Sequence, residues 1–311
     1  MLSRRNIRIK VLQLLYALDR DNQLSPSEAM RQYSRSITNS YTSYLFSLAQ
    51  LMQVARYATE YKKYMLTKLV LSKEDKDFSD KLSTNELVQS IVTNEYWEIA
   101  FRNHHLNELL NDENTKKLYL EFSQTGVYRD YLNKKKTTIA DHIKILLELY
   151  KFIRSRDVFS GMLDDYFFYW EEDSSLVAGA VKRTIKELPV SGKFLSRYKP
   201  DDETTKIFGE TLLKTIIQKD GEFLEIITPN LKNWDAERIA VIDMIIIKMA
   251  MAEFMFFESI PTRVTLNEYV EMAKNYSTDN SKDFINGILD KILKQLSAEG
   301  KIIKSGRGLI D

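Results

Sequence analysis

The sequence predicts an all-α protein, and two features of its composition and patterning carry that prediction. Among 311 residues there are only 10 Gly and 5 Pro, so the residues that mark the turns of all-β and Rossmann-type chains are scarce. Leu, Lys, Glu and Met, which favour helices, recur in segments whose apolar residues have a helical period. A chain of this length can bury a substantial core, as one large domain or as two smaller ones.

The composition excludes several kinds of site. The chain has no Cys and 3 His, which excludes disulfides, thiolate zinc sites and cysteine nucleophiles. No run approaches 18 uncharged apolar residues, so no membrane contact is expected. A cysteine-free chain without an apolar N-terminal segment is typical of the cytoplasm. Since the net charge is +1, nucleic-acid binding would require a local cluster of basic residues.

Apolar periodicity predicts helices along most of the chain. A first helix is expected to end near Asp19, and a new one to begin near Pro26. The segment 41–70 predicts one long helix or two. Further helices are predicted at 135–155, 157–173, 204–219, 221–232, 235–257, 265–276 and 281–297. The clearest linker is 187–203, which contains Pro189, Gly192 and Pro200.

Two of the C-terminal helices have recognisable starts. Thr265 and Glu268 are spaced as a capping box, in which each residue's side chain bonds the other's backbone amide. Val264 and Tyr269 are placed for the accompanying hydrophobic staple. The last helix has three candidate N-caps, which are Asp279, Asn280 and Ser281.

The helix over 235–257 is apolar nearly all round, so it is expected to lie buried at the centre of the fold. Its charged residues are spaced by five and scatter around the axis: Arg238, Asp243, Lys248, Glu253 and Glu258. Buried charges need partners or an exit to solvent. Two interpretations remain open, namely ion pairs inside the protein or an Asp243 that emerges and meets a partner protein.

The first helix carries a local excess of positive charge. Residues 1–18 contain no acidic residue but four basic ones, which are Arg4, Arg5, Arg8 and Lys10. Arg5, Arg8 and Tyr16 fall on one strip, at i, i+3 and i+11. Guanidinium groups neutralise phosphates and an aromatic face stacks a base, a combination that suits single-stranded RNA. The alternative is an ordinary solvated helix face.

Motifs at both ends of the chain extend this pattern. Gln13 and Tyr16 follow the arginines, and "WDAERIAVID" (234–243) opens the long apolar helix. Three further groups come later in the chain, in this order: Glu253-Phe254 with Pro261, Asn267-Glu268 with Ala273-Lys274, and Phe284-Ile285-Asn286-Gly287. In order and spacing these motifs resemble the NusB family of bacterial transcription antitermination factors. The resemblance spans roughly 1–20 and 205–297, with a long segment between them as in the long form of Bacteroides-type bacteria.

The resemblance implies an all-helical NusB-like bundle without catalytic activity or cofactor. It implies binding of boxA RNA in ribosomal RNA transcripts, together with NusE, a ribosomal protein of the small subunit, within the RNA polymerase antitermination complex. The residues implied for RNA are Arg4, Arg5, Arg8, Gln13, Tyr16, Asn280, Lys282 and Phe284, and those implied for NusE are Asp243 and Glu253. Asn6 stands where the family usually has a further arginine.

The resemblance also implies a domain organisation. The first helix (1–22) and a core (201–298) form the NusB-like domain, 23–200 is an inserted helical region, and 299–311 is a flexible tail. If the arginines and Phe284 line a shared groove, the two ends of the chain lie side by side. Gly287 then either leaves room for a nucleotide backbone or permits close helix packing, and both interpretations remain open.

Two other functions deserve comparison. NusB-like domains also occur fused to RNA methyltransferases, but this chain has no Cys and no glycine-rich Rossmann turn. A protein-binding scaffold that keeps NusE but lacks RNA affinity is compatible with Asn6. The pair His104-His105 is expected to be a surface feature rather than a metal site, because adjacent helical side chains diverge by about 100°.

Overall fold

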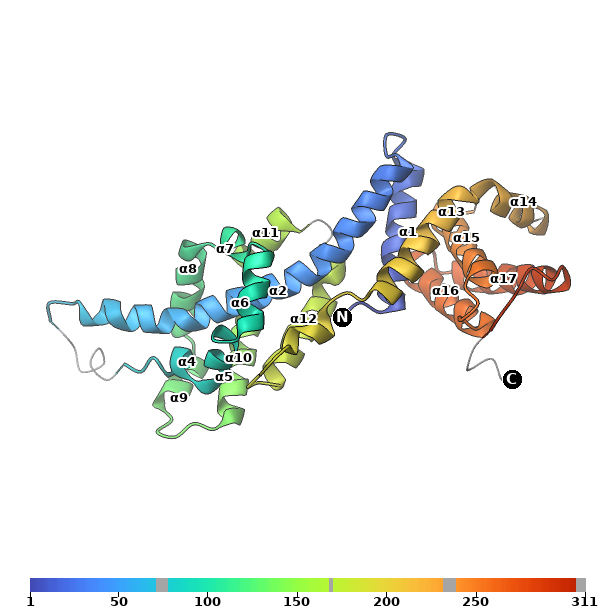
Figure 1. The fold of residues 1–311 in the computed structure, drawn as a ribbon. Coiled ribbons are helices and arrows are strands. Elements are labelled where there is room, and N and C mark those ends of the chain that lie inside the picture. Colours follow the sequence, from blue (N-terminus) through green and yellow to red (C-terminus); the bar gives the residue numbers. More distant parts are fainter. Residues whose placement is uncertain (71–77, 168–169, 232–238, 306–311) are drawn as a thin grey trace. The chain divides into compact units, whose positions relative to one another are not determined.

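The structure is a computed structural model, and it describes residues 1–70, 78–167, 170–231 and 239–305. All regular elements of these residues are helices, so the predicted all-α class is confirmed. Figure 1 shows their arrangement, coloured along the chain. The chain forms two compact units, which are described separately below.

Unit 1 comprises Met1 and Thr38–Lys199, and unit 2 comprises Leu2–Ile37 and Pro200–Asp311. The first boundary falls inside helix α2 (Pro26–Leu66) rather than at residue 22. The second falls at Pro200, within the predicted linker. The segment 41–70 is therefore part of a single helix of 41 residues, which reaches Leu66.

The described residues of unit 1 form ten further helical elements besides its part of α2. They are α4 (Lys81–Thr84), α5 (Glu86–Val92), α6 (Glu95–Asn103), α7 (Leu106–Leu109), α8 (Asp112–Ser123), α9 (Gly126–Asn133), α10 (Ile139–Arg154), α11 (Asp157–Tyr166), α12 (Trp170–Lys186) and the 3₁₀ helix η1 (Phe194–Tyr198). The predicted helix over 157–173 is thus divided, because α11 ends at Tyr166. Phe168 and Tyr169, part of an aromatic run in the sequence, lie outside the described residues.

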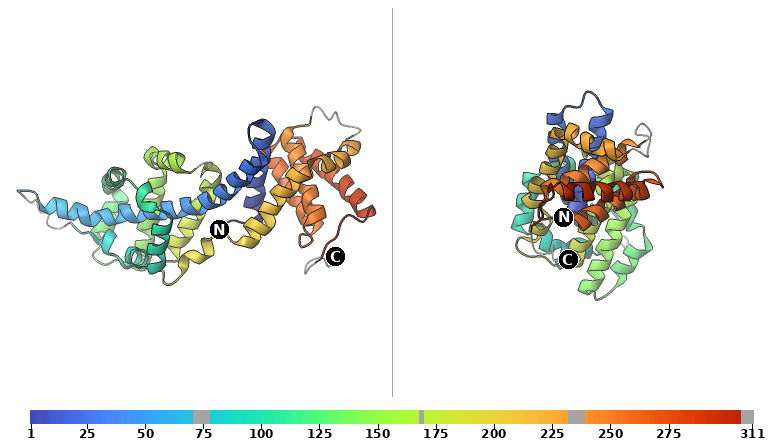
Figure 2. Two further views of the ribbon diagram at one scale, coloured as in Figure 1. Left: turned by 45° about the horizontal axis from the view of Figure 1, so that its top comes forward. Right: turned by 90° about the vertical axis from the view of Figure 1, so that its right-hand side faces the viewer.

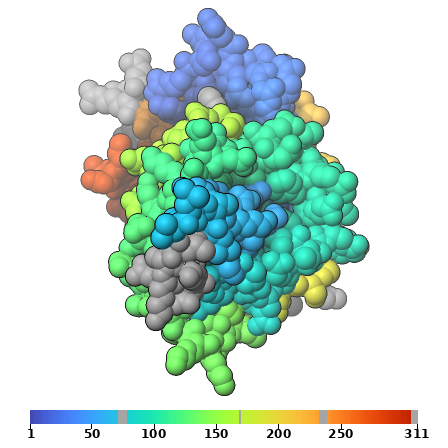
Figure 3. Space-filling model, turned by 90° about the vertical axis from the view of Figure 1, so that its left-hand side faces the viewer, coloured from blue at the N-terminus to red at the C-terminus, as the bar shows by residue number. Residues whose placement is uncertain are grey.

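The core of unit 1 is built around α2. Its residues between Tyr41 and Ala58 are almost entirely buried, and the neighbouring helices meet it through polar contacts as well. The Tyr44 hydroxyl lies 2.8 Å from Thr184 Oγ1, and Gln50 Nε2 donates to Thr115 Oγ1 at 3.1 Å. On the face shown in Figure 3, the end of α2 in light blue emerges between the teal and green helices.

Unit 2 combines the two ends of the described chain. Its elements are α1 (Arg4–Arg20), the start of α2, the π-helix η2 (Glu203–Glu210), α13 (Thr211–Gln218), α14 (Asp220–Asn230), α15 (Val241–Phe256), α16 (Thr262–Tyr276) and α17 (Ser281–Ala298). Ser3 caps α1 by accepting from the amide of Asn6, whose side chain accepts from the amide of Ser3 in return. Asn6 is thus engaged in the capping box.

Helix α15 is the central helix of unit 2, as predicted from its apolar sequence. Most of its residues are buried, and it packs against α1, α13, α16 and α17. Figures 1 and 2 show α15 between α1 in blue and α17 in red. Helix α1 also packs directly against η2 and α13, and α17 packs directly against α14 and α16.

The predicted capping box at Thr265 and Glu268 is wrong. Helix α16 begins at Thr262, directly after Pro261, so Thr265 already lies inside the first turns. Its hydroxyl is fully buried and donates to Glu253 Oε2 at 3.2 Å. Proline fixes the backbone angle that a helix start requires, and this sets the beginning of α16 earlier than the Thr-x-x-Glu pattern indicates.

The first part of the segment after α17 is anchored to α15. Lys304 Nζ donates to the carbonyl oxygens of Glu253 and Phe257, at 2.8 and 2.9 Å. The Ser305 amide donates to the Glu258 carbonyl at 3.1 Å. These bonds tie the segment after α17 to the last turn of α15 and to the two residues that follow it.

Two helical glycines have opposite surroundings. Gly287 in α17 is exposed, and a Cβ built there meets nothing within 4 Å, which contradicts the interpretation that this glycine permits close helix packing. Gly209 in η2 is buried, and a Cβ there would overlap the Tyr33 hydroxyl and Ile7 Cγ2. The Tyr33 hydroxyl cannot move freely, since it donates to the Thr205 carbonyl at 2.6 Å.

We therefore expect alanine to act in opposite directions at these positions. Gly287→Ala should raise the free energy of unfolding by about 0.5–1 kcal/mol, because it removes backbone entropy without a clash. Gly209→Ala should lower it by about 1–3 kcal/mol through overpacking. Urea denaturation of the two variants measures both effects, and a destabilising Gly287→Ala would contradict the open surface at that helix.

Candidate RNA and partner interface

One face of α1 presents basic and aromatic side chains to solvent. Arg5 is exposed, Gln13 is half-buried, and Tyr16 is 39% exposed. Their spacing places them within one strip of the helix surface. The Arg20 guanidinium lies 5.5 Å from the centroid of the Tyr16 ring and extends the same strip. Arg20 was missed by the sequence prediction, although its i+4 spacing from Tyr16 would have indicated it.

The two neighbouring arginines differ in their availability. Arg5 forms no ion pair with any residue that the structure describes. Arg4 is more restricted, because its Nη2 lies 3.2 Å from Glu203 Oε1 and its guanidinium lies 5.6 Å from the centroid of Phe208. The Arg4–Glu203 pair is solvent-exposed, with Glu203 at 75%, so it is weak and an incoming phosphate can replace it.

Arg8 lies in the interior of unit 2, where it forms a bidentate ion pair with Glu253. Arg8 Nε lies 2.6 Å from Glu253 Oε1, and Arg8 Nη2 lies 2.9 Å from Glu253 Oε2. The two residues are 3% and 0% exposed. The remaining terminal nitrogen of Arg8 lies 3.4 Å from Glu268 Oε2. The guanidinium also lies 5.2 Å from the centroid of the Phe208 ring.

The carboxylate of Glu253 is satisfied on both oxygens. Besides Arg8, it accepts bonds from the Tyr269 hydroxyl at 2.5 Å and from the Thr265 hydroxyl at 3.2 Å. Burial alone would lower the pKa of Arg8, but the hydrogen bond and charge of Glu253 raise it above the usual value. Burial, reinforced by the charge of Glu253, raises the pKa of Tyr269 well above its usual value. The Arg8 guanidinium therefore stays charged and Tyr269 stays protonated.

These positions change the roles expected for two residues. Arg8 is not available for the predicted phosphate contact, because its N–H groups donate to Glu253 and Glu268. The predicted NusE contact of Glu253 does not fit either, because its side chain is fully buried. Of the predicted strip on α1, Arg5 and Tyr16 face solvent, whereas Arg8 faces the core. For Glu253, the interpretation as an internal ion pair is correct.

Asp243 is also an internal residue. It is 5% exposed in the first turn of α15, and its Oδ2 accepts from the Ser281 hydroxyl at 2.7 Å. Its Oδ1 is buried without a hydrogen-bond partner among the described residues. The preceding residues 234–238, including Trp234, Asp235 and Arg238 of the family motif, lie outside the described part. Asp243 thus links the starts of α15 and α17.

The start of α17 supplies a second polar surface. Asn280 and Lys282 are exposed there, and Lys282 has no acidic partner in the described part of the chain. Phe284, in contrast, is only 9% exposed. Its ring therefore contributes to the core and offers no open face on which a base can stack. The expectation that Phe284 and the arginines line a shared groove does not hold.

The Arg5 end of α1 and the start of α17 lie toward opposite ends of α15. Arg8 meets Glu253 near the end of that helix, whereas Leu15 and Leu18 line a cavity of about 270 Å³ together with Ile245 and Lys248 near its start. Helix α1 therefore runs antiparallel to α15. Since Asp243 holds Ser281 at the start of α15, the Arg5 end and the Lys282 end are separated by roughly 15 Å along α15.

The histidine pair makes ordinary contacts. His104 Nδ1 lies 2.9 Å from the Thr42 hydroxyl, and His105 Nδ1 lies 3.2 Å from Glu108 Oε1. Among the described residues, no group of three or more His, Asp or Glu side chains is placed to hold a metal ion. In the same residues, no helix combines the length and apolar character needed to cross a membrane.

Comparison with known proteins decides the family. A model of the NusB family matches residues 172–294. The transcription antitermination protein NusB of Salinibacter ruber is 41% identical over 110 residues, which cover 35% of this chain and 69% of that protein. This chain belongs to the NusB family. No solved structure matches it significantly.

Other NusB proteins match over a similar region. That of Chloroherpeton thalassium is 37% identical over 110 residues, covering 35% of this chain and 52% of that protein. That of Natranaerobius thermophilus is 43% identical over 81 residues, covering 26% of this chain and 56% of that protein. These relatives are named as transcription antitermination proteins, so NusB membership supports a non-catalytic role in transcription.

The buried ion pair gives a direct test of the difference between Arg8 and Arg5. Arg8→Ala should lower the free energy of unfolding by about 3–5 kcal/mol, because it leaves the Glu253 charge buried and unpaired. Glu253→Ala should act similarly by stranding Arg8. Arg5→Ala, the matched exposed control, should stay within about 0.5 kcal/mol of the unaltered protein. Equal effects of Arg8→Ala and Arg5→Ala in urea denaturation would contradict the buried pair.

Proposed function

We propose that this NusB protein binds boxA RNA of ribosomal RNA transcripts together with NusE, as part of the RNA polymerase antitermination complex in the cytoplasm. The observation that carries the proposal is the exposed face of α1, where Arg5, Tyr16 and Arg20 stand in a row with Arg4 beside them. Cations along a helix neutralise phosphates, and an exposed aromatic ring stacks a base.

The start of α17 supplies a second polar surface for the RNA. Lys282 supplies a further positive charge, and it has no acidic partner among the described residues. The side-chain amide of Asn280 can form hydrogen bonds with the edge of a base. Gln13 lies between the two ends and supplies another amide. Several nucleotides of a single RNA strand can span the separation of roughly 15 Å along α15. The bases of such a strand are unstacked and individually accessible to these side chains.

The buried residues take supporting roles in this proposal. Arg8 and Glu253 fix α1 against α15, and Asp243 fixes the start of α17 through Ser281. They hold the RNA-binding side chains in place without touching RNA or NusE. The NusE contact then belongs to exposed residues of the same unit, and a variant of Asp243 would affect it indirectly.

Binding of boxA RNA tests the proposal. Four phosphate contacts, from Arg4, Arg5, Arg20 and Lys282, give a slope of about −3 for log affinity against log salt with a single strand. Arg5→Ala should make the slope shallower by about 0.7 and weaken binding. Tyr16→Ala should weaken binding by about tenfold or more, because a stacked base contributes roughly 1–3 kcal/mol. Fluorescence anisotropy with labelled boxA RNA, with and without NusE, measures these effects.

Arg183→Ala is the matched control, because Arg183 is an exposed arginine on α12 without an acidic partner in the described residues. It should leave both affinity and slope unchanged. If the unaltered protein binds NusE but shows no salt-dependent RNA binding, the chain is a protein scaffold. The interior positions of Phe284 and Arg8 favour that second candidate, since they remove two of the predicted RNA contacts.

A further inference from the structure

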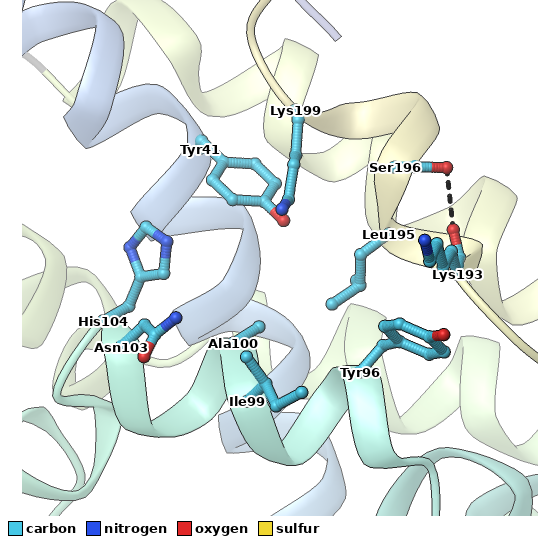
Figure 4. A pocket seen from close by; sticks show the side chains of 10 residues that line it. All are labelled: Tyr41, Tyr96, Ile99, Ala100, Asn103, His104, Lys193, Leu195, Ser196 and Lys199. Atoms are coloured by element: carbon cyan, nitrogen blue, oxygen red, sulfur yellow. Dashed lines mark hydrogen bonds between the residues drawn. The ribbon is translucent and has the colours of Figure 1, made fainter.

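A cavity of about 380 Å³ lies within unit 1, where α2, α6 and η1 meet (Figure 4). It is lined by side chains of α2 and α6 on one part of its wall and by residues 193–199 on another. Its volume is within the range of small-molecule sites. The NusB family match over residues 172–294 includes the cavity residues around η1 but not those of α2 and α6.

The cavity wall carries positive charge without compensation. Lys193 and Lys199 line it, and no aspartate or glutamate does. Neither lysine pairs with an acidic residue in the part of the chain that the structure describes. Lys193 Nζ lies 5.5 Å from the centroid of Tyr96, so this ammonium is held against an aromatic ring of the wall.

A buried hydroxyl in the same wall has no partner. Tyr41 is 4% exposed, and its hydroxyl is buried without a hydrogen bond to any described residue. A buried hydroxyl that lacks a partner destabilises a protein, because it has lost its hydrogen bonds to water without replacing them. A ligand that accepts a hydrogen bond from Tyr41 would remove this penalty, so the hydroxyl points to an acceptor group in the cavity.

His104 completes the polar side of the cavity. Burial, followed by the charges of Lys199 and His105, lowers its pKa below the usual value. The imidazole is therefore neutral near pH 7, and its Nδ1 is engaged by the Thr42 hydroxyl. The positive charge of the cavity comes from Lys193 and Lys199.

The rest of the wall is apolar. Ile99 is 44% exposed at the rim, and Leu195 and Ala100 are buried behind it. The aliphatic and aromatic side chains of this wall can pack against a planar ring. The two lysine ammonium groups and the Tyr41 hydroxyl can donate hydrogen bonds to a phosphate. We propose that this cavity binds a free nucleoside monophosphate, with its phosphate held by Lys193, Lys199 and Tyr41.

Calorimetric titration of the full chain tests the site. The probes are the four 5′-mononucleotides, the corresponding nucleosides, ribose 5-phosphate and inorganic phosphate. A mononucleotide is expected to bind more tightly than its nucleoside, which lacks the phosphate, and than ribose 5-phosphate, which lacks the base. The double variant Lys193→Gln and Lys199→Gln should lose about tenfold or more in affinity.

Two further variants separate ligand binding from folding. Tyr41→Phe removes only the hydroxyl, so it should weaken mononucleotide binding while leaving the urea midpoint unchanged or higher. Lys117→Ala, at an exposed lysine on α8, is the control that should not alter binding. No mononucleotide binding at millimolar concentration, binding that survives loss of both lysine charges, or binding confined to a 5′-phosphorylated oligonucleotide would overturn the proposal.

Discussion

The buried ion pair between Arg8 and Glu253 constrains unit 2 more than any single apolar contact. A charged carboxylate in the interior requires hydrogen bonds on both oxygens, and these come from α1, through Arg8, and from α16, through Thr265 and Tyr269. The three helices are therefore fixed in register at one point of α15. The backbone carbonyl of Glu253 also accepts from Lys304, so the chain after α17 is tied to the same point.

This constraint explains how an exposed helix can present a defined row of side chains. Once Arg8 is fixed in the interior, the helical period fixes the adjacent face of α1, about 60–80° around the helix, where Arg5 and Tyr16 face solvent. A surface held in this way binds a flexible ligand with less loss of conformational freedom than mobile arginines would. Arg8, which its spacing had assigned to RNA, thus fixes α1 from the interior and holds Arg5 and Tyr16 in position.

The sequence predicted the helices well because they depend on local periodicity, whereas it could not predict which polar groups meet. Arg8 and Glu253 are 245 positions apart, and no spacing rule connects such residues. Phe284 belongs to the apolar stripe of its helix and is buried in the core, whereas its expected RNA contact came from the family resemblance alone. The sequence prediction placed the start of α16 at Thr265, because both Pro261 and the Thr265 pattern can mark a helix start. Only the tertiary contact of Thr265 with Glu253 shows that Pro261 precedes the actual start.

The family region and the compact units do not coincide, and α2 and α12 show why. The NusB match begins at residue 172, inside α12, but Val181 and Ile185 of that helix are buried in unit 1. Conversely, the start of α2 belongs to unit 2, where Tyr33 bonds Thr205 and packs over Gly209. A cut at residues 22 and 200 would remove Tyr33 from unit 2 and leave Gly209 without the side chain that packs over it. The NusB family match therefore extends into unit 1 at α12, and unit 2 includes the first part of α2.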